Sequence, residues 1–169
     1  MTKPPIKAGI ISDANVLIDY AGSAPDVLRL ICEHLQQLYI PLPVLKEVRQ
    51  LSVQEVQAFG VEIVEPNLSQ IIEVFNIREQ KPSLSAQDAI CFIMARDNDW
   101  TCLTNDKPLR NLCSSQKVSC IWGLEIMQFL VSSRGITPKK AYEIAKDIQS
   151  KNKYIKEQTL KKFKDKFGL

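Results

Sequence analysis

The chain has 169 residues and a net charge of +3, with 45% hydrophobic and 24% charged residues. This balance is typical of a soluble globular protein of about one domain. The only histidine is His34, and the five cysteines include no C-x-x-C pair. Catalytic triads and zinc sites that need several histidines are therefore excluded, and we expect reduced cysteines in the core.

Apolar runs with strand length and apolar residues with helical spacing alternate along the first 131 residues. In chain order we expect a strand at 9–12, helices at 15–20 and 25–37, a strand at 38–40, helices at 43–51 and 52–59, a strand at 61–64, helices at 68–80 and 85–95, a strand at 100–103, a helix at 107–115, a strand at 118–121 and a helix at 124–131. The alternation predicts a three-layer α/β sandwich, in which helices flank a mainly parallel sheet.

Gly135 interrupts this pattern, and two more helices are predicted, one opened by Thr137-Pro138 and one at 156–167. We expect a body of residues 1–136 and a basic helical extension of residues 137–169. The extension has ten lysines and four acidic residues, a net charge of +6, which leaves −3 for the body. This asymmetry favours a cation site in the body and a separate anion-binding surface, although a solvated lysine-rich helix would look the same.

The sequence does not predict a membrane protein. Residues 1–8 lack the apolar stretch of a signal peptide, and no apolar run is long enough to cross a membrane. We expect a cytoplasmic protein without a membrane partner.

Four acidic residues stand where parallel-sheet proteins carry their functional groups. Asp13 follows the first strand, and Asp106 follows the strand at 100–103 by two residues. Asp88 lies in the first turn of the most apolar helix, and Glu47 borders the apolar side of the helix at 43–51. Because sites form at the carboxyl ends of parallel strands, all four can point into one crevice.

Each acid also has a purely structural interpretation. Asp13 and Asp106 are placed to cap helices, and Asp88 is placed to complete a capping box with Ser85. Glu47 could be an ordinary surface residue. The sequence leaves these roles open for each acid taken singly.

Taken together, the four acids indicate a metal site. Clustered carboxylates repel one another, so one takes up a proton unless a cation is present. Mg²⁺ or Mn²⁺ suits a site made only of oxygen ligands. Such an ion can activate a water molecule and stabilise charge on a phosphodiester, and neither step needs histidine or cysteine.

Four segments carry a family resemblance: 12–19 (SDANVLID), 44–48 (VLKEV), 84–89 (LSAQDA) and 103–106 (LTND). In this order, after strands or at helix starts, they resemble the motifs of the PIN-domain nuclease family. The resemblance implies an endoribonuclease that uses Mg²⁺ or Mn²⁺ to cleave single-stranded RNA. It assigns Asp13, Glu47, Asp88 and Asp106 as the catalytic and metal-binding residues, with Asn15 and Thr104 in support.

The resemblance extends to prokaryotic VapC-type toxins, which implies an antitoxin partner, a toxin-antitoxin role and a homodimer. After Asp106 the chain has Lys107-Pro108, where some family members carry a further acid. This departure leaves the number of metal ions open. The candidate phosphate contacts are Lys46, Arg49, Lys107 and Arg110.

Other functions fit the sequence less well. A catalytically silent PIN module would bind RNA or a protein partner, but the intact acidic set favours an enzyme. A haloacid-dehalogenase-type phosphotransferase begins with D-x-D after its first strand, and here the third position is Asn15. A receiver domain needs a phosphate-accepting Asp after a central strand, and neither Ile40 nor Val64 is followed by one.

Overall fold

The structure is a computed structural model that describes residues 6–169. Five strands form one sheet in the order β3-β2-β1-β4-β5, and all neighbouring strands run parallel. Their bounds are β1 (Gly9–Ser12), β2 (Gln37–Pro41), β3 (Glu62–Val64), β4 (Thr101–Leu103) and β5 (Cys120–Ile121). The predicted parallel α/β sandwich is confirmed.

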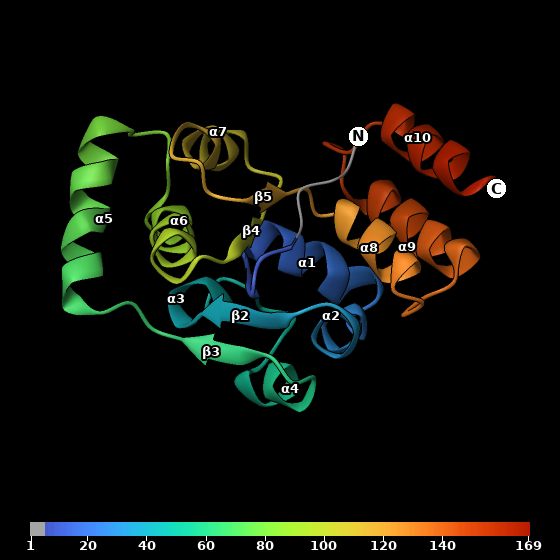
Figure 1. The fold of residues 1–169 in the computed structure, drawn as a ribbon, viewed down its shortest axis with the longest axis horizontal. Coiled ribbons are helices and arrows are strands. Elements are labelled where there is room, and N and C mark those ends of the chain that lie inside the picture. The colour runs from blue at the N-terminus through green and yellow to red at the C-terminus, as the bar shows by residue number, and fades with distance from the viewer. Residues whose placement is uncertain (1–5) are drawn as a thin grey trace.

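Helices cover both faces of this sheet (Figure 1). The helices are α1 (Ala14–Ser23), α2 (Val27–His34), α3 (Leu42–Leu45), α4 (Val53–Ala58), α5 (Leu68–Gln80), α6 (Ala86–Asn98), α7 (Lys107–Ser115), α8 (Glu125–Ser132), α9 (Pro138–Lys151) and α10 (Glu157–Phe167). In Figure 1, α5, α6 and α7 lie on one side, with α1, α2, α8 and α9 on the other. Helix α6 packs on β1 and β4, which explains why every residue from 89 to 95 is buried.

Local capping explains where several helices begin. Ser52 and Glu55 form a capping box at α4, and Asn67 and Gln70 form another at α5. These side chains bind backbone N–H groups that have no partner within the helix. The bounds predicted for β1, α5 and α7 agree with the structure. The apolar run of β1 and the capping residues of the two helices lie within a few residues of these bounds.

The helix predicted at 43–51 is wrong, because α3 ends at Leu45. The backbone then turns, with the N–H groups of Glu47 and Val48 donating to carbonyls three residues earlier. This turn buries Val48 and Leu51 in the core while Ser52 begins a new helix. Glu47 therefore lies on an exposed turn rather than on the side of a helix.

The predicted extension packs against the body. Helix α9 contacts α1 and α8, and α10 contacts α9. The apolar stripe of α9 is buried in the same core as the sheet, with Ala141 and Ala145 fully covered. Phe163 of α10 lies against Tyr142, with ring centroids 6.4 Å apart. The domain division at residue 136 stays a prediction.

No helix within residues 6–169 is both long and apolar enough to cross a membrane. The expected absence of a signal peptide rests partly on residues 1–5, which lie outside the described residues. The five cysteines are free, and Cys91, Cys102 and Cys113 are buried.

Candidate metal and active site

The candidate site lies at the carboxyl edge of the sheet, where the strand order changes direction. Strand β1 is paired with β2 on one side and with β4 on the other, although β4 comes much later in the chain. The loops that leave β1 and β4 therefore diverge at this edge, which is where open parallel sheets bind ligands. Asp13 and Asp106 follow these two strands.

Asp13 is buried at the end of β1, with 1% of its surface exposed. Its carboxylate caps α1 by accepting a 3.0 Å hydrogen bond from the backbone N–H of Val16, and it also accepts one from the Thr104 hydroxyl. Burial raises the pKa of Asp13 from 3.8 to about 7. The two hydrogen bonds oppose this shift, whereas the charges of Asp88 and Asp106 add to it.

Thr104 joins Asp13 to the loop that carries Asp106. Its buried hydroxyl donates to Asp13 and accepts from the backbone N–H of Asp106 at 3.0 Å. Asp106 in turn caps α7, where its carboxylate accepts a 2.9 Å hydrogen bond from the Leu109 N–H. Asp13 and Asp106 therefore both cap helices, as the sequence suggested, and they also lie close to each other.

Asp88 and Glu47 approach the same place from other elements. Asp88 is half-buried in the first turn of α6, where its N–H donates to the Ser85 hydroxyl at 3.0 Å. Burial raises the pKa of Asp88, and the negative charges of Asp106 and Glu47 raise it further, against a hydrogen bond with Ser85. The structure thus brings Asp13, Asp88 and Asp106 within electrostatic reach of one another, and Glu47 within reach of Asp88.

Among the described residues, no basic side chain is a main influence on the pKa of Asp13 or of Asp88. The main influences on the pKa values of Asp13 and Asp88 are burial, hydrogen bonds from hydroxyl and backbone groups, and other carboxylates. Within residues 6–169, no three His, Cys, Asp or Glu side chains are arranged so that they could hold a metal ion between them. The oxygen donors suit a hard divalent cation, which would have to draw the carboxylates closer together than they stand here.

The other predicted site residues lie in different places around the acids. Exposed Asn15 and Lys107 line a cavity of about 690 Å³ together with Asp106, whereas Asp13 and Asp88 do not line it. Lys46 and Arg49 are exposed on either side of Glu47.

Arg110 points away from that cavity. It donates to the Thr104 carbonyl at 3.0 Å and to the Cys120 sulfur at 3.4 Å, and it stacks on Trp122. Its proposed contact with phosphate stays a prediction.

The sequence did not single out Asn105, Trp122, Asn152 and Tyr154, which border the same edge of the sheet. Asn105 belongs to the LTND segment and Trp122 directly follows β5, so their positions after strands were a usable signal. Asn152 and Tyr154 come from the loop between α9 and α10, and only the packing of α9 on α1 brings that loop to the site.

Comparisons with known proteins identify one matching family. No curated protein matches the chain. Among solved structures, the crystal structure of PAE2754 from Pyrobaculum aerophilum is 18% identical and covers 76% of this chain and 97% of its own, with a TM-score of 0.49. A family model described as a PIN domain, DUF3368, matches residues 9–169, which is nearly the whole chain and includes the extension. The chain therefore belongs to the PIN-domain family.

Proposed function

We propose that this protein is a divalent-metal-dependent endoribonuclease that hydrolyses phosphodiester bonds of single-stranded RNA. The observation that carries the proposal is the proximity of Asp13, Asp88 and Asp106 at the switch point of the sheet, with Asp13 buried and no basic residue among the main influences on its pKa. Such a group is costly in a protein that binds no cation. Membership of the PIN-domain family supports the nuclease class.

In this proposal Asp13, Asp88 and Asp106 hold Mg²⁺ or Mn²⁺, and Glu47 completes the site directly or through water. When bound, the metal supplies an activated water and stabilises negative charge on the phosphodiester. Thr104 keeps the carboxylate of Asp13 oriented and links it to the Asp106 backbone. In this proposal the exposed side chains of Lys107, Lys46 and Arg49 contact phosphate groups of the RNA.

The test compares wild-type protein with Asp13→Asn on a mixed-sequence single-stranded RNA, with Mn²⁺, with Mg²⁺ and with EDTA. Cleavage by the wild type should require metal, and the D13N variant should lose it by at least about 100-fold because the buried carboxylate is gone. Asp99→Asn is the matched control. Asp99 is exposed at the end of α6 in a left-handed conformation that Asn also adopts, so cleavage should be unchanged.

The outcomes separate the proposed enzyme from a silent module. Equal cleavage by wild type and D13N would contradict a role for Asp13. If the wild type neither cleaves RNA nor binds Mn²⁺ in calorimetry, the mechanism is contradicted. That result would favour a PIN module that only binds RNA or protein.

We also propose the protein partners implied by the toxin resemblance, an antitoxin and a second copy of the chain. Helix α5 supports a protein contact because Leu68, Ile71, Ile72 and Phe75 expose 40–73% of their surface on it. Light scattering of wild type and Phe75→Glu would test the homodimer, since the added charge should shift a dimer to monomer. A wild-type monomer would contradict it.

A further inference from the structure

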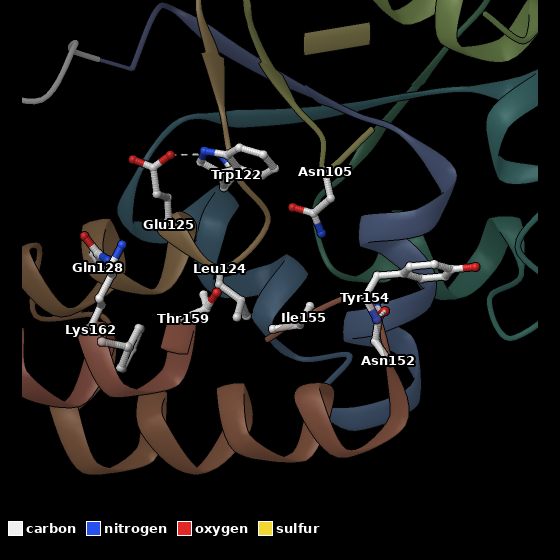
Figure 2. A pocket seen from close by; sticks show the side chains of 11 residues that line it. Asn105, Trp122, Leu124, Glu125, Gln128, Asn152, Tyr154, Ile155, Thr159 and Lys162 are labelled. Atoms are coloured by element: carbon white, nitrogen blue, oxygen red, sulfur yellow. Dashed lines mark hydrogen bonds between the residues drawn. The ribbon is translucent and has the colours of Figure 1, made fainter. Parts of the chain in front are cut away.

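Two neighbouring cavities form one groove beside the carboxylates. The cavity next to Asp106 has a volume of about 690 Å³, and a second of about 390 Å³ lies between the loops after β4 and β5 and the α9–α10 extension. Both are lined by Asn105, Asn152 and Tyr154, so they adjoin at these residues, and we call the two cavities together the groove. Figure 2 shows the side chains that line the smaller cavity, including Trp122, Asn105 and Tyr154.

Two exposed aromatic rings border this groove. Tyr154 exposes 82% of its surface and Trp122 exposes 47%, and both line the smaller cavity. The guanidinium of Arg110 lies 3.6 Å from the centroid of the Trp122 ring and holds it in place from the side of α7. Exposed aromatic rings in a groove are the surfaces on which unpaired nucleic-acid bases stack, whatever their sequence.

The loop that carries Tyr154 is fastened to α1. The side-chain amide of Asn152 donates to both carboxylate oxygens of Asp19, at 3.0 and 3.1 Å. Its carbonyl oxygen accepts from the Tyr154 N–H at 3.0 Å. Lys151 adds a 2.6 Å hydrogen bond to the Gly22 carbonyl. Tyr154 is therefore exposed without lying on a loose segment, which lowers the entropy lost when a base binds.

The charges along the groove favour a polyanion. Exposed Lys107 and Lys153 line the cavity beside Asp106, and exposed Lys162 lines the cavity beside Trp122. Lys151 also lines the groove, so four lysines outnumber the three acidic residues there, which are Asp19, Asp106 and Glu125. Lysines spaced along a groove between aromatic rings match alternating phosphates and bases better than they match a peptide.

We propose that this groove is a subsite for unpaired bases of the RNA, in which Tyr154 and Trp122 stack on bases while Lys107, Lys153 and Lys162 contact phosphates. The proposal rests on the proposed nuclease function and adds a role for the extension. Asn152 is a positioning residue, since it acts through Tyr154.

The test measures the affinity for a fluorescein-labelled, mixed-sequence single-stranded RNA by anisotropy, in EDTA so that no cleavage occurs. Tyr154→Ala should weaken binding by about 5-fold to 100-fold, the effect of losing one stacked base. Tyr154→Phe retains the ring and should bind within about 2-fold of wild type. Val53→Ala removes exposed apolar atoms from α4, which lines neither cavity, and should not change the affinity. Thermal unfolding of each variant checks that the fold is intact.

Two further measurements test the mode of binding. Lys153→Gln should reduce the slope of log affinity against log salt concentration by about 1, as expected for one lost phosphate contact. With Mn²⁺, Tyr154→Ala should raise KM for RNA cleavage and leave kcat close to wild type, because the proposed mechanism gives Tyr154 a role in binding RNA and none in the chemical step.

The failure of this proposal is distinguishable from failure of the nuclease proposal. If wild type cleaves RNA and Tyr154→Ala binds it with wild-type affinity, the base subsite is wrong and the nuclease stands; the groove would then fit a protein partner. If Tyr154→Ala loses RNA binding but wild type never cleaves, the groove binds RNA and the nuclease proposal is wrong.

Discussion

The hydroxyl group of Thr104 lies between the acids that follow β1 and β4. It donates to Asp13 and accepts from the Asp106 backbone, so both its hydrogen-bonding functions are used at a position with no exposed surface. A valine of nearly the same shape would leave the Asp106 N–H without this partner. The arrangement of the acids therefore depends on a neutral residue as well as on the carboxylates themselves.

The raised pKa of Asp13 predicts a dependence of stability on pH in metal-free protein. In the folded protein its pKa is about 7, against 3.8 for an exposed Asp. Between these pH values the folded state holds a proton that the unfolded chain has lost, so stability falls as pH rises from about 4 to 7. The D13N variant has no carboxyl group at this position, so its stability does not fall for this reason as pH rises. In EDTA, we compare the melting temperature of D13N with that of wild type at two pH values. The difference, D13N minus wild type, should be several degrees larger at pH 8 than at pH 5.

Thermal unfolding monitored by circular dichroism measures this difference. Asp99→Asn is the control, because it removes an exposed carboxylate outside the candidate site and leaves Asp13 in place. A melting-temperature difference between D13N and wild type that stays constant from pH 5 to pH 8 would show that Asp13 has an ordinary pKa.

The packing between strands β1, β2 and β4 depends on a glycine. The rings of Tyr39 and Trp100 stack with centroids 3.8 Å apart, and they lie over Gly9. A Cβ atom at Gly9 would come within 2.5 Å of the Trp100 ring and 2.7 Å of the Tyr39 ring. The contact also explains why the strand predicted from 100 begins at 101, since Trp100 packs across the strand ends.

Gly9→Ala should therefore destabilise the protein by about 1–3 kcal/mol, the usual effect of overpacking. Gly22→Ala is the matched control, because nothing lies within 4 Å of a Cβ atom built there in α1. This second variant should be neutral or more stable by up to about 1 kcal/mol. Urea denaturation compares them, and equal stability of both variants would contradict the packing argument.

At the scale of the whole molecule, the extension is part of the fold. Ala141, Ala145 and Ile148 of α9 expose at most 1% of their surface, and α9 covers α1 and α8. The family match also continues to residue 169. The body and the extension have opposite net charges, which is consistent with separate sites for metal and phosphate.

Removal of residues 137–169 should consequently unfold the body or lower its melting temperature by more than about 10 °C, because it uncovers an apolar face. Removal of residues 157–169 alone should have a smaller effect, since α10 packs mainly on α9. Circular dichroism and binding of a hydrophobic dye would report both. A truncated body that melts like the full chain would support an independent domain of residues 1–136.

Much of the fold and the choice of acids could be predicted because their signals are local. The strand at 9–12 and the helices at 68–80 and 107–115 follow from apolar spacing and capping residues within a few positions. Glu47 shows where this fails. Apolar residues at helical spacing suggested a helix through Leu51, but α3 ends at Leu45 and the chain turns while still burying Val48 and Leu51. Spacing alone cannot distinguish these outcomes because each buries the same side chains.

The sequence by itself determined the fold class, the family motifs and the four acids, since strand length, helix periodicity and capping act between near neighbours. Only the tertiary structure decided that Thr104 bridges Asp13 to the Asp106 loop and that Asn152 fastens the Tyr154 loop to α1. These contacts join residues about 90 to 130 positions apart in the chain. Their partners are selected by how whole helices and strands pack, and no local pattern carries that information.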